Sequence, residues 1–569
     1  MKQWWKEATV YEIYVRSFKD STGDGLGDIG GIISKLGYLK KLGVDVIWLT
    51  PIYESPEADN GYDISNYLRI SPKFGTMKMF DRLLKETHKR GMRLIMDGVF
   101  NHTSDEHSWF LESKKSRTNK YRDYYFWRNG QKDREPNNWV SFFGGSVWEY
   151  DKDTRQYYLH IFSKKQPDLN WDNKAVREEI YAIMKWWLDK GIDGFRFDVI
   201  NFISKTRSLR DANPSRGKKY ADGSKYYKNG PNINKYLKEM NMRVLSKYDI
   251  MTVGETAANI EDINATRLYV DSRRHELNMV FHENNEIHSD KKTAEIATLL
   301  DKRHDKFKWT LPNLKRAITA WQEGLGDYCW DTAYLGNHDY PRIVSRFGDD
   351  KKYRTESAKM LATLIFTLRG TPFIYQGDEI GMTNGDFKSI NDYVDIGAIN
   401  MYNEYLSRHK NGRAYALKIL RKISRDNART PMQWDDSRNA GFSKRKPWIK
   451  VNSNYRTVNV EAALKDKNSI FYYYKKLIEI RKGSNTMMYG KYRHVLDKHP
   501  DIFAYTRSLG SEKILVLLNF KGKATKFKQH RDVLLNGAEL IIGNYPESEN
   551  KYELRPYEAA VYVICSRHS

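Results

Sequence analysis

Residues 94–100 (LIMDGVF) and 194–199 (GFRFDV) are short apolar runs that each carry an acidic side chain. The second run follows residues 176–190, whose apolar side chains repeat at helical spacing. The same alternation of a short β-type run with a longer amphipathic stretch predicts further strands at residues 9–15, 44–49, 250–253, 279–281, 332–335 and 371–375. Eight strands separated by helical segments predict an α/β fold, a (β/α)8 TIM barrel.

Two parts of the chain do not follow this alternation. Residues 103–171 are aromatic and polar and too many for an ordinary βα loop, so we expect them to form a small domain inserted after the third strand. From residue 486 onward, hairpin-like runs such as 502–505 and 514–518 indicate a C-terminal antiparallel β-sandwich. We therefore predict a barrel of residues 1–102 and 172–485, an inserted domain 103–171 and a C-terminal domain 486–569.

The charge balance is strongly basic, with a formal net charge of +24 at pH 7. Lys and Arg alternate with Asp and Glu along stretches such as residues 80–90 (FDRLLKETHKR), which is typical of a solvated helix face, so we expect no nucleic-acid partner. We see no signal-peptide pattern and no apolar run of bilayer length, which predicts a cytoplasmic protein without a membrane partner, and we expect a monomer. The two cysteines, Cys329 and Cys565, give no disulfide framework or zinc spacing, and we expect no organic cofactor.

Polar residues at the C-terminal ends of the predicted strands are the functional candidates, because barrel active sites lie at that end. A single Asp there is more often a turn residue than a catalyst. Carboxylates at three strand ends, each beside another polar group, are better explained by a catalytic site. The candidates are Asp97, Asn101, His102, Arg196, Asp198, Glu255, Asn337, His338 and Asp339.

Two of these carboxylates suit the cleavage of a glycosidic bond. Such a reaction needs a carboxylic acid to protonate the leaving oxygen and a carboxylate on the opposite face of the sugar. Asp198 and Glu255 follow neighbouring strands and are expected to face one pocket. We expect Arg196 to keep Asp198 ionised, and Glu255, on a less cationic strand, to have the raised pKa that a general acid needs.

The ordered set of motifs at residues 97–102 (DGVFNH), 194–199 (GFRFDV), 253–255 (VGE) and 337–339 (NHD) resembles the four motif regions of glycoside hydrolase family 13, the α-amylase superfamily. The resemblance implies that Asp198 is the nucleophile, Glu255 the acid/base and Asp339 a carboxylate that stabilises the transition state. It also implies that Asp97 is structural. His102, Arg196 and His338 would then line the subsite of the non-reducing glucose.

Narrower motifs at residues 59–65 (DNGYDIS), 198–201 (DVIN), 381–384 (GMTN) and 424–435 (SRDNARTPMQWD) resemble oligo-1,6-glucosidases and other exo-acting α-glucosidases. The resemblance implies that Asp59 and Arg425 hold the 4-hydroxyl of the terminal glucose and that Tyr62 stacks on the same ring. Val199, directly after the nucleophile, is similar to the residue in α-1,6-active members, whereas alanine is typical of α-1,4-specific maltases. The expected substrates are isomaltose and short isomalto-oligosaccharides, cleaved with retention from the non-reducing end.

The loop at residues 20–28 (DSTGDGLGD) presents oxygen side chains at alternate positions, separated by glycines. This spacing is similar to the first part of an EF-hand loop. A polar, glycine-rich turn without a metal is the alternative. The family resemblance favours a structural calcium ion, held by Asp20, Thr22, Asp24, the carbonyl of Leu26, and Asp28.

Other members of the same family offer alternative functions. Trehalose-6-phosphate hydrolases share these motifs, and the loop at 205–228 is rich in Lys and Arg that could contact a phosphate; a merely basic surface is the simpler interpretation. Residues 271–277 and 309–318 are similar to sucrose isomerases, but Val199 disfavours these because they usually carry threonine there. Non-hydrolytic relatives that serve as transporter subunits need a membrane anchor and lose the catalytic carboxylates. This sequence keeps all three carboxylates, so we do not expect it to belong to that class. Residues 281–290 and Tyr340 depart from the family pattern on the leaving-group side.

Overall fold

The computed structural model describes residues 3–131, 134–214, 219–256, 263–282, 309–529, 533 and 535–565. Its centre is a parallel eight-stranded sheet with the order β11-β10-β9-β5-β2-β1-β13-β12. The two end strands meet where the Thr332 hydroxyl of β12 donates to the Val280 carbonyl of β11 at 2.9 Å, which closes the barrel. The barrel strands are β1 (Val10–Ile13), β2 (Val46–Leu49), β5 (Arg93–Gly98), β9 (Gly194–Phe197), β10 (Met251–Thr256), β11 (Met279–His282), β12 (Thr332–Ala333) and β13 (Thr371–Tyr375). The predicted TIM barrel is confirmed.

Helices connect successive barrel strands and form the outer layer of the barrel. The helix α2 begins three residues earlier than its apolar spacing suggests, because the Asp28 carboxylate caps it by accepting from the Gly31 N–H at 2.6 Å. It ends at Gly43, whose φ of 105° suits glycine. The long helices of this layer are α2 (Ile29–Leu42), α3 (Met77–Lys89), α5 (Lys174–Asp189), α7 (Ile233–Arg243), α8 (Ile263–Val270), α10 (Leu311–Gly324), α12 (Arg354–Thr367) and α17 (Ile470–Gly483).

Several shorter elements accompany the barrel. Helices α13 and α14 follow β13 and enclose a small apolar cluster of their own around Ile419 and Leu420. The strands β3 and β4 form a hairpin between β2 and α3. These elements are α1 (Trp4–Glu7), β3 (Tyr53–Glu54), β4 (Asn66–Ile70), α4 (Ser108–Lys115), α6 (Ser224–Tyr227), α11 (Ile343–Phe347), α13 (Ile396–Arg408), α14 (Arg413–Ile423), α15 (Asp426–Arg429), α16 (Val460–Lys465) and α18 (Asn485–Tyr489).

Two further sheets lie outside the barrel. The strands β6 (Trp127–Arg128), β7 (Trp148–Asp151) and β8 (Gln156–Leu159) form an antiparallel sheet within the predicted inserted domain. At the other end of the chain, β14 (Lys491–Val495), β15 (Ile502–Leu509), β16 (Glu512–Asn519), β18 (Glu539–Gly543) and β20 (Ala559–Cys565) form a five-stranded sheet, and β17 (Thr525–Lys526) pairs with β19 (Glu553–Leu554). Both regions are antiparallel as expected, while the exact domain limits stay a prediction.

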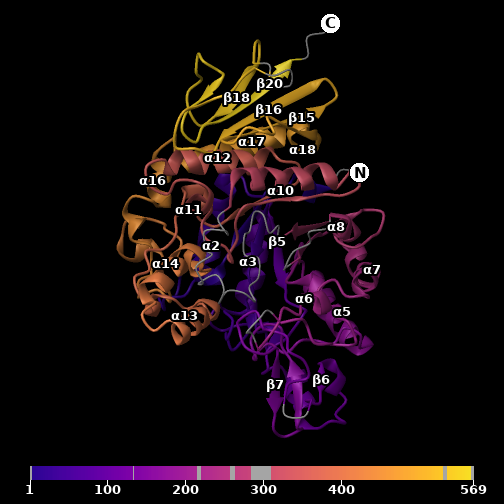
Figure 1. Cartoon of the computed structure of the whole chain (residues 1–569). Helices are drawn as coiled ribbons and strands as arrows, with labels where there is room; N and C mark the ends of the chain where they lie inside the picture. The colour runs from indigo at the N-terminus through magenta and orange to yellow at the C-terminus, as the bar shows by residue number, and fades with distance from the viewer. Residues whose placement is uncertain are drawn as a thin grey trace.

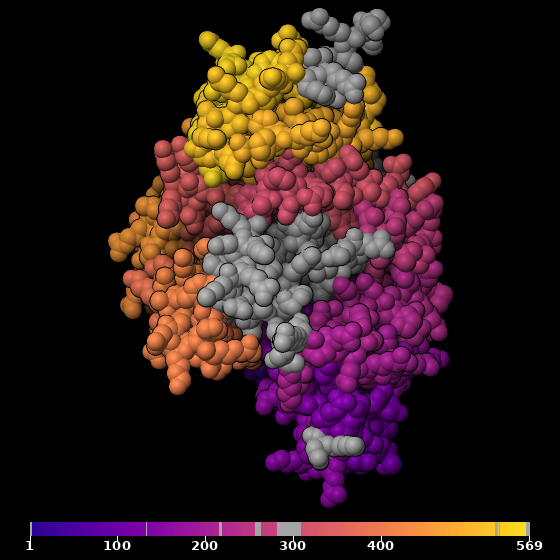
Figure 2. Space-filling view, in the orientation of Figure 1, coloured from indigo at the N-terminus to yellow at the C-terminus, as the bar shows by residue number. Residues whose placement is uncertain are grey.

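The arrangement of the three parts is visible in Figure 1. The C-terminal sheet lies at the top, beyond α12 and α17, and β6 and β7 lie at the opposite end of the molecule (Figure 1). In the space-filling view, the C-terminal residues cap the molecule and the segment around β6 and β7 projects from its lower end (Figure 2). Within the described ranges, no helix combines the length and the apolar character needed to span a bilayer.

Candidate active site

One buried arginine organises the C-terminal ends of β5, β9 and β10. The guanidinium of Arg196, 1% exposed, lies 2.7 Å from Asp97 Oδ1, 2.8 Å from Asp198 Oδ1 and 2.7 Å from Glu255 Oε2. The strand register brings these side chains together, because Arg196 of β9 pairs with Asp97 of β5 and with Val253 of β10. The predicted nucleophile and the predicted acid therefore share one cation at the mouth of the barrel.

The shared arginine corrects one expectation. Glu255 was expected on a less cationic strand than Asp198, yet Arg196 contacts both carboxylates. Burial raises the pKa values of Asp198 and Glu255, and the charge of Arg196 only partly offsets this effect in either group. Because three carboxylates meet one guanidinium, a proton on one of them relieves their mutual repulsion. The asymmetry between acid and nucleophile therefore does not come from Arg196.

The close approach of the strands depends on Gly194 at the start of β9. Its φ is +142°, and a Cβ atom there would lie 1.9 Å from the Met251 carbonyl oxygen of β10. A larger residue would force the two strands apart at the point where they begin to run side by side. The glycine of the GFRFDV motif thus positions the carboxylates at the other end of these strands.

Val199, the residue after Asp198, has a backbone conformation that is rare for a β-branched side chain. Its φ of 35° and ψ of 44° lie in the left-handed region. In this conformation its N–H donates to Glu255 Oε2 at 3.0 Å, and its side chain is 5% exposed. The residue predicted to select the linkage therefore also contacts the predicted acid through its backbone.

A second group of predicted residues meets around Arg425. Its guanidinium lies 3.2 Å from Asp339 Oδ1 and 3.5 Å from Asp59 Oδ1, and its Nε donates to Asp395 at 3.0 Å. Arg429 adds a contact of 2.8 Å to the same Asp339 oxygen. Burial alone would raise the pKa of Asp339, but the contact with His338 and the charges of Arg425 and Arg429 outweigh burial and hold this pKa below its usual value. Asp339 is therefore ionised at neutral pH.

Tyr62 and His338 join the two groups. The rings of Tyr62 and His338 stack with their centroids 5.4 Å apart and an angle of 4° between the planes. The Tyr62 hydroxyl donates to Asp97 Oδ2 at 3.1 Å and lies 2.7 Å from His338 Nε2. On its other side, His338 Nδ1 lies 2.6 Å from Glu12 Oε1. A continuous polar chain thus crosses the barrel mouth from β1 to β5.

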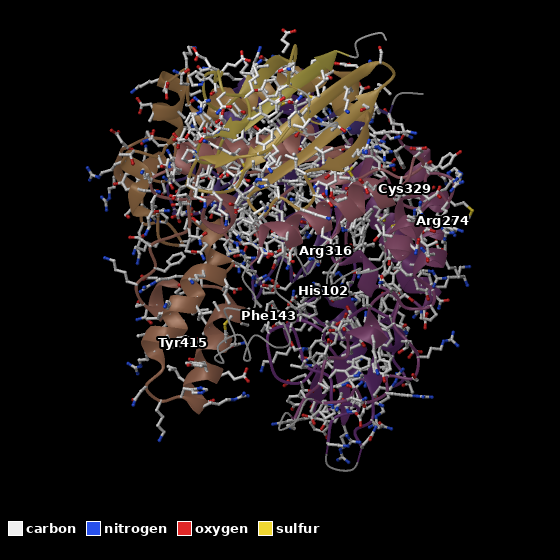
Figure 3. The ribbon with its side chains drawn as sticks, turned by 45° about the horizontal axis from the view of Figure 1, so that its top comes forward. His102, Phe143, Arg274, Arg316, Cys329 and Tyr415 are labelled. Atoms are coloured by element: carbon white, nitrogen blue, oxygen red, sulfur yellow. The ribbon has the colours of Figure 1, made fainter. Side chains whose placement is uncertain are left out.

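His102 lies beside this chain, at the edge of the inserted segment. Its Nε2 lies 3.0 Å from the Tyr62 carbonyl and 3.2 Å from Gln166 Nε2, and Gln166 also donates to Asp59 at 3.1 Å. Burial lowers the pKa of His102 to about 4, so its ring is neutral. Figure 3 labels His102 and Phe143, and the rings of both pack against Phe162, with centroids 5.3 Å and 6.3 Å away.

The structure thus gathers all ten predicted catalytic and substrate-binding residues into one region. The same region also contains Glu12, Gln166, Asp395 and Arg429, which were not among the predicted residues. An acidic residue inside the apolar first strand was a signal for Glu12, and the helical spacing from Arg425 was a signal for Arg429. Gln166 and Asp395 sit in irregular segments and carry no local signal.

The five predicted calcium ligands lie in the loop between β1 and α2. Asp20 accepts from Gly23 N at 2.6 Å and from Gly25 N at 2.9 Å. Asp28 accepts from Ser21 N at 2.8 Å as well as capping α2. Across the part of the chain that the structure describes, no group of three or more acidic, His or Cys side chains is placed to hold a metal ion. The loop is held together by hydrogen bonds within the protein.

Comparison with known proteins supports the same chemistry. Residues 12–490 match the family model for the alpha amylase catalytic domain. The chain is 55% identical to an oligo-1,6-glucosidase from Parageobacillus thermoglucosidasius and 45% identical to a trehalose-6-phosphate hydrolase from Bacillus subtilis, and each alignment covers at least 98% of both chains. Its structure is similar to that of the isomaltulose synthase from Protaminobacter rubrum, with a TM-score of 0.92, 44% identity and 99% coverage of both chains. With its barrel, its strand-end carboxylates and this similarity over nearly the whole chain, the protein belongs to the α-amylase family of glycoside hydrolases.

Proposed function

We propose that this chain is a retaining, exo-acting α-glucosidase that hydrolyses the α-1,6 bonds of isomaltose and short isomalto-oligosaccharides. The observation that carries the proposal is the joint contact of Arg196 with Asp198 and Glu255, which places two carboxylates at the ends of neighbouring strands. Oligo-1,6-glucosidases from four species, 49% to 55% identical over 99% of this chain, support the linkage.

The proposed reaction proceeds in two steps. Asp198 attacks the anomeric carbon while Glu255 donates its proton to the leaving oxygen, which breaks the glycosidic bond and forms a covalent glucosyl ester on Asp198. Glu255, now ionised, removes a proton from water as the water oxygen attacks the same carbon. Glucose leaves with its original anomeric configuration, and both carboxyl groups return to their starting protonation states.

The exo mode follows from the group around Arg425. Asp59 and Arg425 would bind the 4-hydroxyl of the terminal glucose, and Asp395 holds the guanidinium in place from the other side. In this arrangement a carboxylate and a guanidinium would fill the position where a preceding sugar would attach, so the pocket would accept only a chain end. His102, Tyr62 and the proposed transition-state carboxylate Asp339 would complete the glucose subsite.

The direct test is glucose release by the purified protein from isomaltose, maltose, sucrose and trehalose-6-phosphate in parallel. Isomaltose should be cleaved fastest, and proton NMR should detect α-glucose first. Asp198→Asn should abolish cleavage, whereas the matched control Asp193→Asn, at the opposite end of the same strand, should retain it. Preference for another linkage, or release of β-glucose first, would contradict the proposal.

The principal alternative is a trehalose-6-phosphate hydrolase, whose phosphate would need cations near the leaving-group side. Lys205 is buried against Asp168 at 3.2 Å, so it does not belong to a basic surface. Arg207 and Lys219 are exposed. Arg207 lies 3.6 Å from Asp172, and Lys219 lies 3.4 Å from Glu135. Residues 215–218 of the basic loop and residues 283–290 of the predicted leaving-group side lie outside the described residues. Preference for the phosphorylated sugar in the same assay would establish this alternative.

We propose in addition that the β1–α2 loop binds a structural calcium ion. Asp24 supports the proposal because it is exposed and, with Asp20, Thr22, Asp28 and the Leu26 carbonyl, supplies oxygen donors of the kind calcium prefers. The hydrogen bonds already accepted by Asp20 and Asp28 count against it. Calcium should raise the thermal midpoint of EDTA-treated protein, magnesium should not, and Asp24→Asn should lose the effect. An unchanged midpoint would refute the site.

The oligomeric state and the compartment are proposals as well. We propose a monomer that works in the cytoplasm, supported by a buried, unpaired Cys329 that needs no oxidising environment. Light scattering coupled to size exclusion should give the mass of a single 67.0 kDa chain. A dimer mass over a range of concentrations would contradict this.

A further inference from the structure

Glu12 of β1 is a buried carboxyl group that the proposed reaction does not use. It is 2% exposed, and its Oε1 lies 2.6 Å from Nδ1 of His338, which in turn is fully buried. Its neighbours along β1 are apolar or aromatic. A carboxyl group that is removed from water at this depth is costly unless it is neutral or well paired, so its protonation state has a structural consequence.

The other nitrogen of His338 decides where the protons lie. His338 Nε2 is 3.1 Å from Asp339 Oδ2 and 2.7 Å from the Tyr62 hydroxyl. An ionised carboxylate only accepts hydrogen bonds, so a lone pair on Nε2 would face a negative oxygen without a proton between them. The Tyr62 hydroxyl lies 3.1 Å from Oδ2 of Asp97, whose other oxygen accepts from Arg196, and we place the one hydroxyl proton of Tyr62 on the contact with Oδ2. With the Tyr62 proton in that position, a hydrogen on Nε2 satisfies both the Tyr62 oxygen and the Asp339 carboxylate.

With the hydrogen on Nε2, a neutral His338 presents only a lone pair at Nδ1. That lone pair faces Glu12 Oε1, and two lone pairs at 2.6 Å would repel each other. A proton must lie between them, and burial indicates which group holds it: the pKa of Glu12 is raised well above its usual value, and that of His338 is lowered to about 3. The ionisable groups facing Glu12 are His338 and Asp339 after β12, Asp97 in β5, Arg196 in β9 and Tyr375 in β13.

We propose that Glu12 is a positioning residue: as a neutral acid it donates its proton to Nδ1 of His338, and this fixes the Nε2–H tautomer that faces Asp339 and the sugar pocket. The tautomer of a histidine is set by the hydrogen bond at its other nitrogen, and the wrong tautomer costs activity even where the geometry is intact. The stacking of His338 between Tyr62 and Tyr14 holds the ring plane, with centroids 5.4 Å and 5.8 Å away, but it does not select a tautomer. Glu12 supplies that selection.

Nitrogen-15 NMR of histidine-labelled protein tests the tautomer directly. The signal of His338 is assigned as the one absent in His338→Gln, and at pH 7 its Nδ1 should have the chemical shift of an unprotonated ring nitrogen. A protonated Nδ1, in either the other tautomer or the imidazolium, would overturn the proposal. This readout needs no turnover, so it stands even if the proposed function, on which the role of His338 rests, fails in the glucose-release assay.

Two substitutions test whether the donor matters. Glu12→Leu removes it and should lower kcat for isomaltose by about 10- to 100-fold, by analogy with the loss of a partner that orients a metal-bound histidine. Glu12→Gln keeps an N–H donor without a titratable group and should restore most of that loss. Equal losses in both variants would show that a negative charge is what matters and would overturn the proposal. If Glu12→Leu does not fold, the activity of Glu12→Gln and the chemical shift of His338 Nδ1 still test the proposal.

Discussion

At the residue scale, the site is a set of buried charges whose protonation depends on close neighbours. Arg196 contacts three carboxylates, while Arg425 and Arg429 both contact Asp339. The first group therefore has one arginine for three acids, whereas in the second group two arginines contact the same oxygen of Asp339. This difference explains why burial raises the pKa of Glu255, whereas the pKa of Asp339 is lowered.

The raised pKa values predict a bell-shaped dependence of kcat/KM on pH. As pH falls, Asp198 gains a proton and can no longer attack. As pH rises, Glu255 loses the proton that the leaving oxygen needs, so activity is lost on both sides. Because burial raises the pKa of both groups, both limbs should lie at higher pH than for exposed carboxyls, and the two groups titrate as a pair. Rates of isomaltose cleavage measured across the pH range check this; constant activity into alkaline pH would contradict it.

A second prediction at this scale concerns Val199. Val199→Ala should lower the ratio of kcat/KM for isomaltose to that for maltose, because the smaller side chain opens the space next to the nucleophile. The ratio is measured with isomaltose and maltose for both the parent and Val199→Ala. As a control, Val46→Ala removes the same atoms from a buried position in β2 and should leave the ratio unchanged. An unaltered ratio in Val199→Ala would mean that this side chain does not select the linkage.

At the element scale, the strand ends are held in place by the helices that precede them. The helix α5 leads directly into β9, which carries Arg196, and Asn173 is the N-cap residue of this helix. The Asn173 side chain accepts from Ala175 N at 2.9 Å and donates to the Asp123 carbonyl of the inserted segment at 3.2 Å. One side chain thus caps the helix and connects it to the preceding region.

Replacing this cap should destabilise the protein in a graded way. Asn173→Ala removes both hydrogen bonds and should lower the free energy of unfolding by about 0.5–2 kcal/mol. Asn173→Asp keeps the capping acceptor and should lose less. Thermal denaturation of the parent, Asn173→Asp and Asn173→Ala in parallel measures the order of their stabilities. Equal midpoints in all three would show that the cap contributes nothing here.

At the scale of the whole molecule, the C-terminal sheet is joined to the barrel through buried arginines. Arg507 of β15 is fully buried, and its guanidinium donates to the Gly490 carbonyl at 3.0 Å and also to the Thr367 carbonyl at the end of α12. Arg481 of α17 donates in the same way to the Phe366 carbonyl at 2.7 Å. The barrel and the sheet therefore share a polar network in their common interior.

This network predicts that the two parts unfold together. Arg507→Met leaves several buried carbonyls without donors, each at a cost of about 1–3 kcal/mol, and should clearly lower the thermal midpoint. Arg507→Lys keeps the positive charge but loses the planar guanidinium with its several N–H donors. Its thermal midpoint should therefore lie between those of the parent and Arg507→Met. Calorimetry should show one transition in the parent. Two separate transitions there would contradict the shared interior.

The sequence by itself determined the barrel, the antiparallel character of the outer regions and the strand-end carboxylates, because helix and strand periodicity are local and each acid lies next to its own strand. The tertiary structure alone decided which charges meet. Glu12 and His338 are 326 positions apart, and Gln166 and Asp59 are 107 apart. Such pairs form only when the barrel closes, so no pattern along the chain specifies them. Asp198 and Glu255 share Arg196, contrary to the expectation from the sequence, because this contact depends on the register of β9 and β10.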